Sequence, residues 1–351
     1  MLGRVTFHAA FALIAIAFSN ALPQSPWQFT NRLQIGAERD DNIYESKSRP
    51  TAALCGRLLF RSRTERSWQR TQISFAYSGG LQTYSSHADE NKLTNELNAD
   101  LRWTLNRWCQ ITGAVQGTVK VYFNGPYDFG TTQSALQVTL QLPQRWALTL
   151  STATSRLDYA ESDAFDFLGR TVGATVRKRL ADWLVAEGGL HVAWLQYLRL
   201  LRENAPPAYP FSMSEKQHDR QTGAVARLAI GRKFLIHLSA EFQRNTSNSF
   251  GYDYNRWRLS LIAAFRIAPR WLMRVAALRQ HKKYAEPLSL AQPLELDTER
   301  SESNFLVGDV SYDISQDLGW LVRVAFYDNE GAVRGLFYQK TLLFSGFEYR
   351  F

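Results

Sequence analysis

The feature that most constrains this chain is a repeated unit: a short polar or basic turn, then at once Trp or Phe, then a segment of alternating apolar and polar residues. Seven such turns occur, at 65–68, 106–108, 143–146, 181–183, 231–234, 268–271 and 317–320. Alternation with a period of two is typical of a β-strand that has one apolar and one polar face. The repeat therefore predicts successive hairpins joined by short turns and longer connections.

Longer polar connections separate the short turns. They occupy 40–50, 85–91, 124–130, 160–165, 202–217, 246–253, 285–301 and 328–335. Seven turns and eight connections join sixteen strands, and a hidden strand or a merged pair would change the count to fourteen or eighteen. The expected fold is all-β: an up-and-down antiparallel barrel of about sixteen strands, with short turns on one rim and long connections on the other.

The apolar face of these strands is expected to point outward. In 234–243 and 257–266, one set of alternate residues is apolar and the other is largely polar or small. A barrel of about sixteen strands is wide enough to hold water, so an apolar interior is hard to fill. The alternation therefore predicts a transmembrane barrel with lipid outside and a polar lumen.

The N-terminus carries the pattern of a secretory signal peptide. Arg4 precedes an apolar run at 9–18, and small residues follow at 19–21. The run is shorter than the roughly 20 residues that a membrane-spanning helix needs. We expect residues 1–21 to be removed on export and residues 22–351 to form a single barrel domain.

The C-terminus ends in a strand whose alternate residues are Phe347, Tyr349 and Phe351. This ending resembles the terminal strand of Gram-negative outer-membrane β-barrel proteins, the porin-like superfamily. The resemblance implies that these three residues form the assembly signal that the barrel-assembly machinery recognises. It also implies a place in the cell outer membrane, among its lipid and lipopolysaccharide, and it allows a homotrimer.

A second resemblance concerns residues 35–44, where an acidic and Asn-containing cluster closes the first strand. This segment is similar to the first hairpin of barrels encoded with exopolysaccharide-export systems and of surface-lipoprotein assembly modifiers. A modifier would be expected to carry N-terminal helical repeats, and this chain has none. A periplasmic export partner is the further expectation from this resemblance.

The inward face leans basic. The candidate lumen-lining residues are Arg57, Arg102, Lys120, Arg227, Arg258 and Arg323. Arg and Lys side chains that line a water-filled pore lower the electrostatic barrier to the entry of anions. The leading expectation is therefore a channel for passive diffusion of small hydrophilic solutes, with a preference for anions. The alternative for these side chains is pairing with carboxylates across strands. Two other functions stay open: an export or surface-assembly barrel that needs a periplasmic partner, and a structural or adhesive barrel.

No catalytic, cofactor or metal site is expected. His191 and His237 fall on the inward register, and His87, His218 and His281 fall near loops, so no lipid-facing pair of Ser and His is expected for a lipase-type site. The cluster at 40–42 is interpreted as an Asx turn rather than a Ca²⁺ site. Cys55 falls on a lumen-facing register and Cys109 at a turn on the lipid-facing register of another strand, so no disulfide between them is expected. The net charge of +9 is scattered along the chain, so no nucleic-acid partner is expected.

Overall fold

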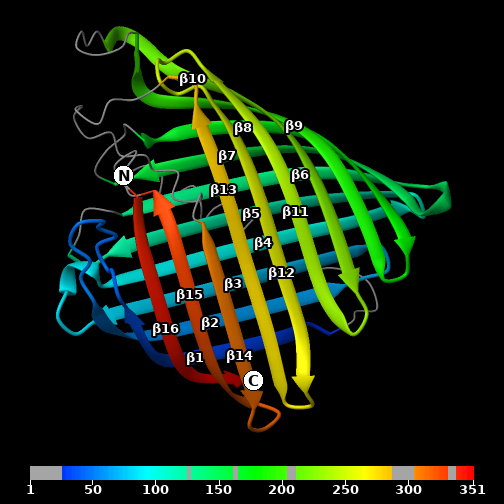
Figure 1. Ribbon diagram of the computed structural model, residues 1–351. Helices are drawn as coiled ribbons and strands as arrows, with labels where there is room; N and C mark the ends of the chain where they lie inside the picture. The colour runs from blue at the N-terminus through cyan, green and yellow to red at the C-terminus, as the bar shows by residue number, and fades with distance from the viewer. Residues whose placement is uncertain (1–25, 125–127, 161–164, 204–210, 287–303, 331–336) are drawn as a thin grey trace.

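The computed structural model describes residues 26–124, 128–160, 165–203, 211–286, 304–330 and 337–351, and these residues form one closed β-barrel. Sixteen antiparallel strands follow one another around the barrel in chain order (Figure 1), which confirms the predicted fold and strand count. The strands are β1 (Gln28–Asp40), β2 (Ala53–Ser67), β3 (Thr71–Tyr84), β4 (Lys92–Asn106), β5 (Cys109–Tyr122), β6 (Phe129–Leu142), β7 (Trp146–Tyr159), β8 (Phe167–Ala181), β9 (Leu184–Arg202), β10 (Phe211–Gly231), β11 (Phe234–Ser247), β12 (Tyr254–Ala268), β13 (Trp271–Tyr284), β14 (Phe305–Asp313), β15 (Leu318–Glu330) and β16 (Phe337–Arg350).

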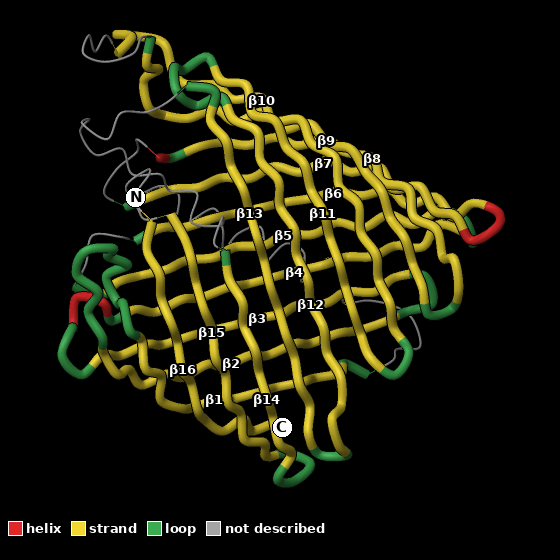
Figure 2. Tube along the Cα trace, in the orientation of Figure 1, coloured by secondary structure: helices red, strands yellow, loops and turns green. Residues whose placement is uncertain are grey.

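Helical structure among the described residues consists of short 3-10 turns, including η1 (Ala88–Glu90) and η2 (Pro143–Arg145). Strands dominate the trace in Figure 2. Among the described residues, no helix is long and apolar enough to cross a membrane. The signal peptide expected at 1–21 lies outside the residues that the structure describes.

The barrel has two unlike rims. Asn31 and Phe351 exchange backbone hydrogen bonds of 3.0 and 3.1 Å, so the first and last strands meet at one rim. The seven short turns lie at this rim, which we call the turn-side rim. The eight longer connections lie at the opposite, loop-side rim. This asymmetry is the one predicted from the repeat.

One predicted connection was wrong. Residues 202–217 were expected to form a single long connection, but β9 runs to Arg202 and β10 already begins at Phe211. Phe211 pairs with Arg202 and Lys216 pairs with Leu200, with a register shift between the two pairs. A β-bulge of this kind absorbs extra residues while the strand continues, so the break in alternation did not mark the end of the strand.

The barrel closes where β1 pairs with β16. Gly36 lies opposite Gly346, and the ring of Phe344, which is 1% exposed, lies against both glycines. A Cβ atom at Gly346 would lie 2.4 Å from the Ile35 carbonyl oxygen and 2.6 Å from the Phe344 ring. The closure seam therefore depends on two positions without a side chain.

The apolar residues of the strands point outward, as the alternation predicted. On β12, Trp257 is 55% exposed and Leu259 is 56% exposed, whereas the intervening Arg258 is only partly exposed. On β11, Phe234 and Leu238 are exposed, whereas the alternate residues Gln243 and Asn245, near the other end, are buried. The outer surface of the barrel is thus an apolar wall, and polar side chains fill the inner face.

Candidate functional site in the barrel lumen

The six predicted lumen residues all lie at inward positions of the barrel wall. They belong to β2, β4, β5, β10, β12 and β15. On each of these strands the residues directly before and after the predicted lumen residue face outward; examples are Leu58 beside Arg57 and Trp257 beside Arg258. Register pairs keep the same face along the sheet, so the six side chains share one interior.

Three of the six are paired with carboxylates on a neighbouring strand. Arg57 Nη1 lies 2.5 Å from Glu38 Oε2, and Arg323 Nε lies 2.5 Å from Asp309 Oδ1. Arg227 forms an ion pair with Glu187. These three arginines therefore follow the alternative prediction, in which an inward cation pairs with a carboxylate on a neighbouring strand. Their charges are largely compensated inside the wall.

The other three have different neighbours. Arg102 Nη1 donates to Gln72 Oε1 at 3.1 Å. Lys120 Nζ lies 4.7 Å from the ring centroid of Tyr122, a cation–π distance. Arg258 lies opposite Glu241 in the β11–β12 register, but Glu241 pairs with Arg256 at 3.4 Å. Arg102 and Arg258 form no ion pair with a carboxylate of the described residues.

An arginine cluster lies in the turn-side half of the lumen. Arg61 on β2 is under the electrostatic influence of Arg32, Arg274 and Arg323, with Glu348 as its neighbouring carboxylate. Arg274 also reaches Asp309 at 3.4 Å. The cluster brings together β1, β2, β13 and β15. Arg274 was missing from the predicted inward set, although it alternates with the outward residues Met273 and Val275 on β13.

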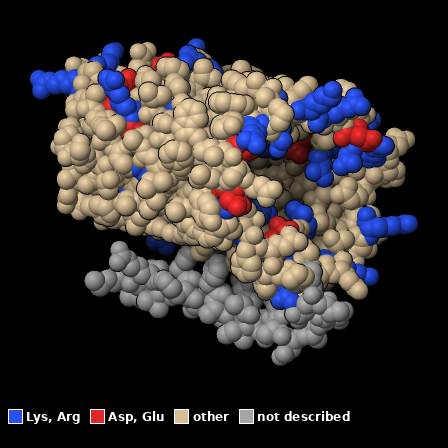
Figure 3. Space-filling view, turned by 90° about the horizontal axis from the view of Figure 1, so that it is seen from below, with Lys and Arg blue, Asp and Glu red and all other residues tan. Residues whose placement is uncertain are grey.

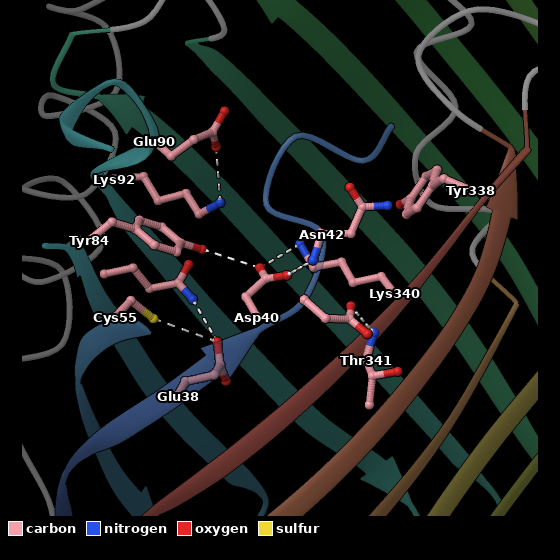
Figure 4. Close-up of polar contacts among 12 residues, drawn as sticks. Glu38, Asp40, Asn42, Cys55, Tyr84, Glu90, Lys92, Tyr338, Lys340 and Thr341 are labelled. Atoms are coloured by element: carbon pink, nitrogen blue, oxygen red, sulfur yellow. Dashed lines mark hydrogen bonds and ion pairs between the residues drawn. The ribbon is translucent and has the colours of Figure 1, made fainter. Parts of the chain in front are cut away.

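The loop-side half of the lumen holds a buried polar network on β1, β2, β3 and β16 (Figure 4). Glu38 and Asp40 are each 1% exposed. Glu38 accepts from Arg57 and from Gln82 Nε2 at 3.2 Å. Asp40 pairs with Lys340 Nζ at 2.7 Å and accepts from the Tyr84 hydroxyl at 3.4 Å. We call this group the seam network, because it spans the strands beside the β1–β16 closure.

The seam network was only partly visible in the sequence. The alternation along the first strand predicts that Glu38 faces inward, whereas the cluster at 40–42 predicts only that Asp40 belongs to an Asx turn. The turn itself is confirmed: the backbone N–H of Asn42 donates to Asp40 Oδ1 at 3.0 Å. The other carboxylate oxygen of Asp40 makes the contact with Lys340, three hundred residues away along the chain. Only the β1–β16 register reveals that contact.

A second buried network occupies the loop-side half on β9 to β12. Gln217 and Asp219 on β10 are 0% and 5% exposed. Gln217 accepts from Arg199 Nε at 2.8 Å and donates to Asp219 at 2.9 Å. Asn245 donates to the other oxygen of Asp219 at 3.0 Å. The guanidinium of Arg199 also stacks 4.4 Å from the centroid of Tyr252.

Exposure within the lumen therefore changes along the barrel axis. Inward residues near the loop-side rim are mostly buried, whereas several inward cations near the turn-side rim are exposed, namely Arg63, Arg102, Arg177, Arg179 and Arg266. In Figure 3 the charged side chains gather around a hollow on one part of the face, while much of the remaining face is tan. The exposed inward cations are therefore concentrated toward the turn-side rim.

The three C-terminal aromatic residues lie outside the barrel at the turn-side rim. Phe347, Tyr349 and Phe351 are all about half exposed, and the rings of Tyr349 and Phe351 stack with centroids 5.4 Å apart. Trp108, Trp183, Phe234 and Trp271, which follow short turns and are exposed, extend this outward aromatic belt. Their positions fit the face expected of an assembly signal, whose role stays a prediction.

The remaining reactive side chains form no site with one another. Cys55 and Cys109 are both free, so the expectation that they do not form a disulfide is confirmed. His191 and His237 lie inward, and His191 packs over Gly223. Among the described residues, no three His, Cys, Asp or Glu side chains are arranged to hold a metal ion.

No family model matches the sequence, and no curated protein sequence matches it. Several solved structures share its architecture. OccAB3 of Acinetobacter baumannii is 11% identical with a TM-score of 0.47, covering 93% of this chain and 99% of that one. A bacterial polysaccharide outer membrane secretin is 7% identical with a TM-score of 0.44, covering 92% and 98%. A loop L8 deletion mutant of OmpT, from Vibrio cholerae, is 9% identical with a TM-score of 0.44, covering 93% and 99%. The likeness is in the barrel fold alone.

Proposed function

We propose that this protein is an integral outer-membrane channel through which small hydrophilic solutes diffuse, with a preference for anions. The observation that carries the proposal is the inversion of the barrel wall: apolar side chains are exposed outside, and charged side chains line the inside. A soluble barrel would place these faces the other way round. The aromatic belt at the turn-side rim suits a membrane interface.

The anion preference rests on the turn-side half of the lumen. The exposed Arg177, Arg179 and Arg266 face solvent there, and Arg32 and Arg61, which lie opposite each other in the β1–β2 register, lie in the same half of the wall. Uncompensated cations in a low-dielectric channel lower the electrostatic barrier for an anion and raise the barrier for a cation. The paired residues Arg57, Arg227 and Arg323 contribute little to this bias.

Solute uptake into liposomes tests the proposal. The refolded mature barrel is reconstituted, and swelling rates are compared for glucose, glucuronate and glucosamine, which match in size and differ in charge. The expected order is glucuronate, then glucose, then glucosamine. Equal rates for all three would remove the anion preference. Absence of swelling with a folded, membrane-inserted barrel would contradict passive diffusion itself.

The buried loop-side networks favour a second candidate function. Glu38, Asp40, Gln217 and Asp219 are held in closed polar contacts where a diffusion channel would need water. A barrel narrowed in this way would conduct poorly alone and would suit an export or surface-assembly system that opens it through a periplasmic partner. Such a barrel would be silent in the swelling assay and would gain permeability when the partner is added.

A further inference from the structure

Four basic side chains lie on the outer face of the barrel near the loop-side rim, where an apolar surface is expected. They are Arg170 on β8, Arg220 on β10, Arg244 on β11 and Lys283 on β13, and all four are exposed. None of them is paired with a carboxylate of the described chain. We call these four residues the outer basic patch.

The register of the sheet brings the patch together. Arg170 and Arg220 both pair with Trp194, which lies between them on β9. Arg244 and Lys283 both pair with Asn255 on β12. Residues two strands apart are separated by about 10 Å. Arg220 pairs with Thr246, two residues from Arg244, so these two cations are diagonal neighbours at about 7–8 Å.

The patch borders the apolar belt directly. On β11 and β12, the next outward residues toward the barrel centre are Phe242 and Trp257, whose ring centroids are 4.7 Å apart. Leu190 on β9 and Leu259 on β12 continue the belt and are 68% and 56% exposed. Cations immediately above an exposed apolar surface occupy the level of lipid headgroups.

An outward groove of about 940 Å³ crosses β10 to β16 on the barrel-centre side of the patch, and on β11 and β12 Phe242 and Trp257 lie between the two. On each of these strands it is lined by two successive outward-facing residues and the backbone between them, which places it on the exterior. Leu228, Leu238, Leu259 and Leu261 supply its apolar wall. Arg279, on the same strand as Lys283, lines it as well and pairs with Asp328 at 3.4 Å.

From the patch and the groove together we infer a binding site for a phosphorylated lipid of the lipid A type, as carried by lipopolysaccharide. Arg220, Arg244 and Lys283 hold its phosphate groups, and an acyl chain lies in the groove. Arginine forks match phosphate oxygens, and an anion relieves the mutual repulsion of the four unpaired cations. The inference rests on the outer-membrane placement of the barrel and is independent of whether the lumen conducts.

Native mass spectrometry of the refolded mature barrel tests the site. The protein is offered equal amounts of bisphosphorylated lipid A and its phosphate-free counterpart, and the retained lipid is counted. The wild type is expected to retain the phosphorylated form preferentially. Each cation near an anionic lipid contributes about fivefold in affinity, so R220Q/R244Q/K283Q should bind about 100-fold more weakly.

Arg39→Gln is the matched control. Arg39 is outward and exposed at the same rim on β1, but its register neighbours are Leu54 and Leu343 rather than cations. This variant should bind lipid A as the wild type does. Heat-modifiable migration verifies folding, and the single variant Arg244→Gln, with about a fivefold loss, serves if the triple variant does not fold.

Equal retention of both lipids by the wild type would overturn the site, because the groove alone would then account for binding. Unchanged affinity in the charge variants would overturn it too. Conductance recorded on the same variants separates this inference from the proposed channel: a silent wild-type barrel that still selects phosphorylated lipid A would refute the channel and support the lipid site.

Discussion

Replacing Gly346 with Ala should weaken the closure of the barrel. The new Cβ atom would lie 2.4 Å from the Ile35 carbonyl oxygen, 2.6 Å from the Phe344 ring and 2.9 Å from Gly36 Cα. The first and third contacts are with backbone, so relief requires β1 and β16 to move apart. The Phe344 ring, the second contact, is itself buried, with 1% of its surface exposed. Overpacking of this kind costs about 1–3 kcal/mol, and we expect a loss of about 2 kcal/mol in the free energy of unfolding.

Urea unfolding of the barrel in lipid vesicles, followed by tryptophan fluorescence, measures this loss. Gly308→Ala is the control, because nothing lies within 4 Å of a Cβ atom at Gly308. That variant should be neutral or gain up to about 1 kcal/mol, since alanine lowers the entropy of the unfolded chain. Equal stability of the two variants would refute the claim that the seam requires glycine.

Three other changes test separate parts of the account. Arg258→Glu should move the reversal potential of the channel toward cations, because Arg258 faces the lumen with Glu241 already engaged elsewhere; an unaltered potential would remove it from the wall. Phe351→Ser should lower the amount of heat-modifiable barrel in outer-membrane fractions, and normal assembly would refute its role as a signal. Asp40→Asn should lower the free energy of unfolding, measured in urea, by about 3 kcal/mol, because it leaves the buried ammonium of Lys340 unpaired. Asp158, which forms an exposed ion pair with Arg156, is the comparison. Asp158→Asn should lower the free energy of unfolding by less than about 1 kcal/mol.

Period-two alternation predicted which residues of each strand face the lumen and which face outward, because this assignment depends only on neighbouring residues of the same strand. Arg57, Arg258 and Arg323 were placed on the inward face in this way. The same reasoning could have found Arg274, which alternates with outward residues on β13. It failed in 202–217, where a bulge shifts the register and breaks the pattern without ending the strand.

Contacts between distant strands could not be predicted, because they depend on the register that the closed barrel sets. The Gly36–Gly346 seam and the Asp40–Lys340 pair join the first strand to the last. Whether an inward arginine is paired or free depends on the same register, which is why Arg227 proved to be neutralised by Glu187. The outer basic patch has a weak local signal, a cation at an otherwise apolar position such as Arg244 after Phe242.

Single-channel recording in a planar bilayer under a salt gradient shows whether the barrel is an anion-preferring diffusion channel. The refolded mature barrel should give steady openings with a reversal potential on the anion side, because the exposed Arg177, Arg179 and Arg266 of its turn-side lumen form no ion pair with a carboxylate of the described residues. A folded, inserted barrel that shows no openings, or openings that select cations, would contradict a basic diffusion channel.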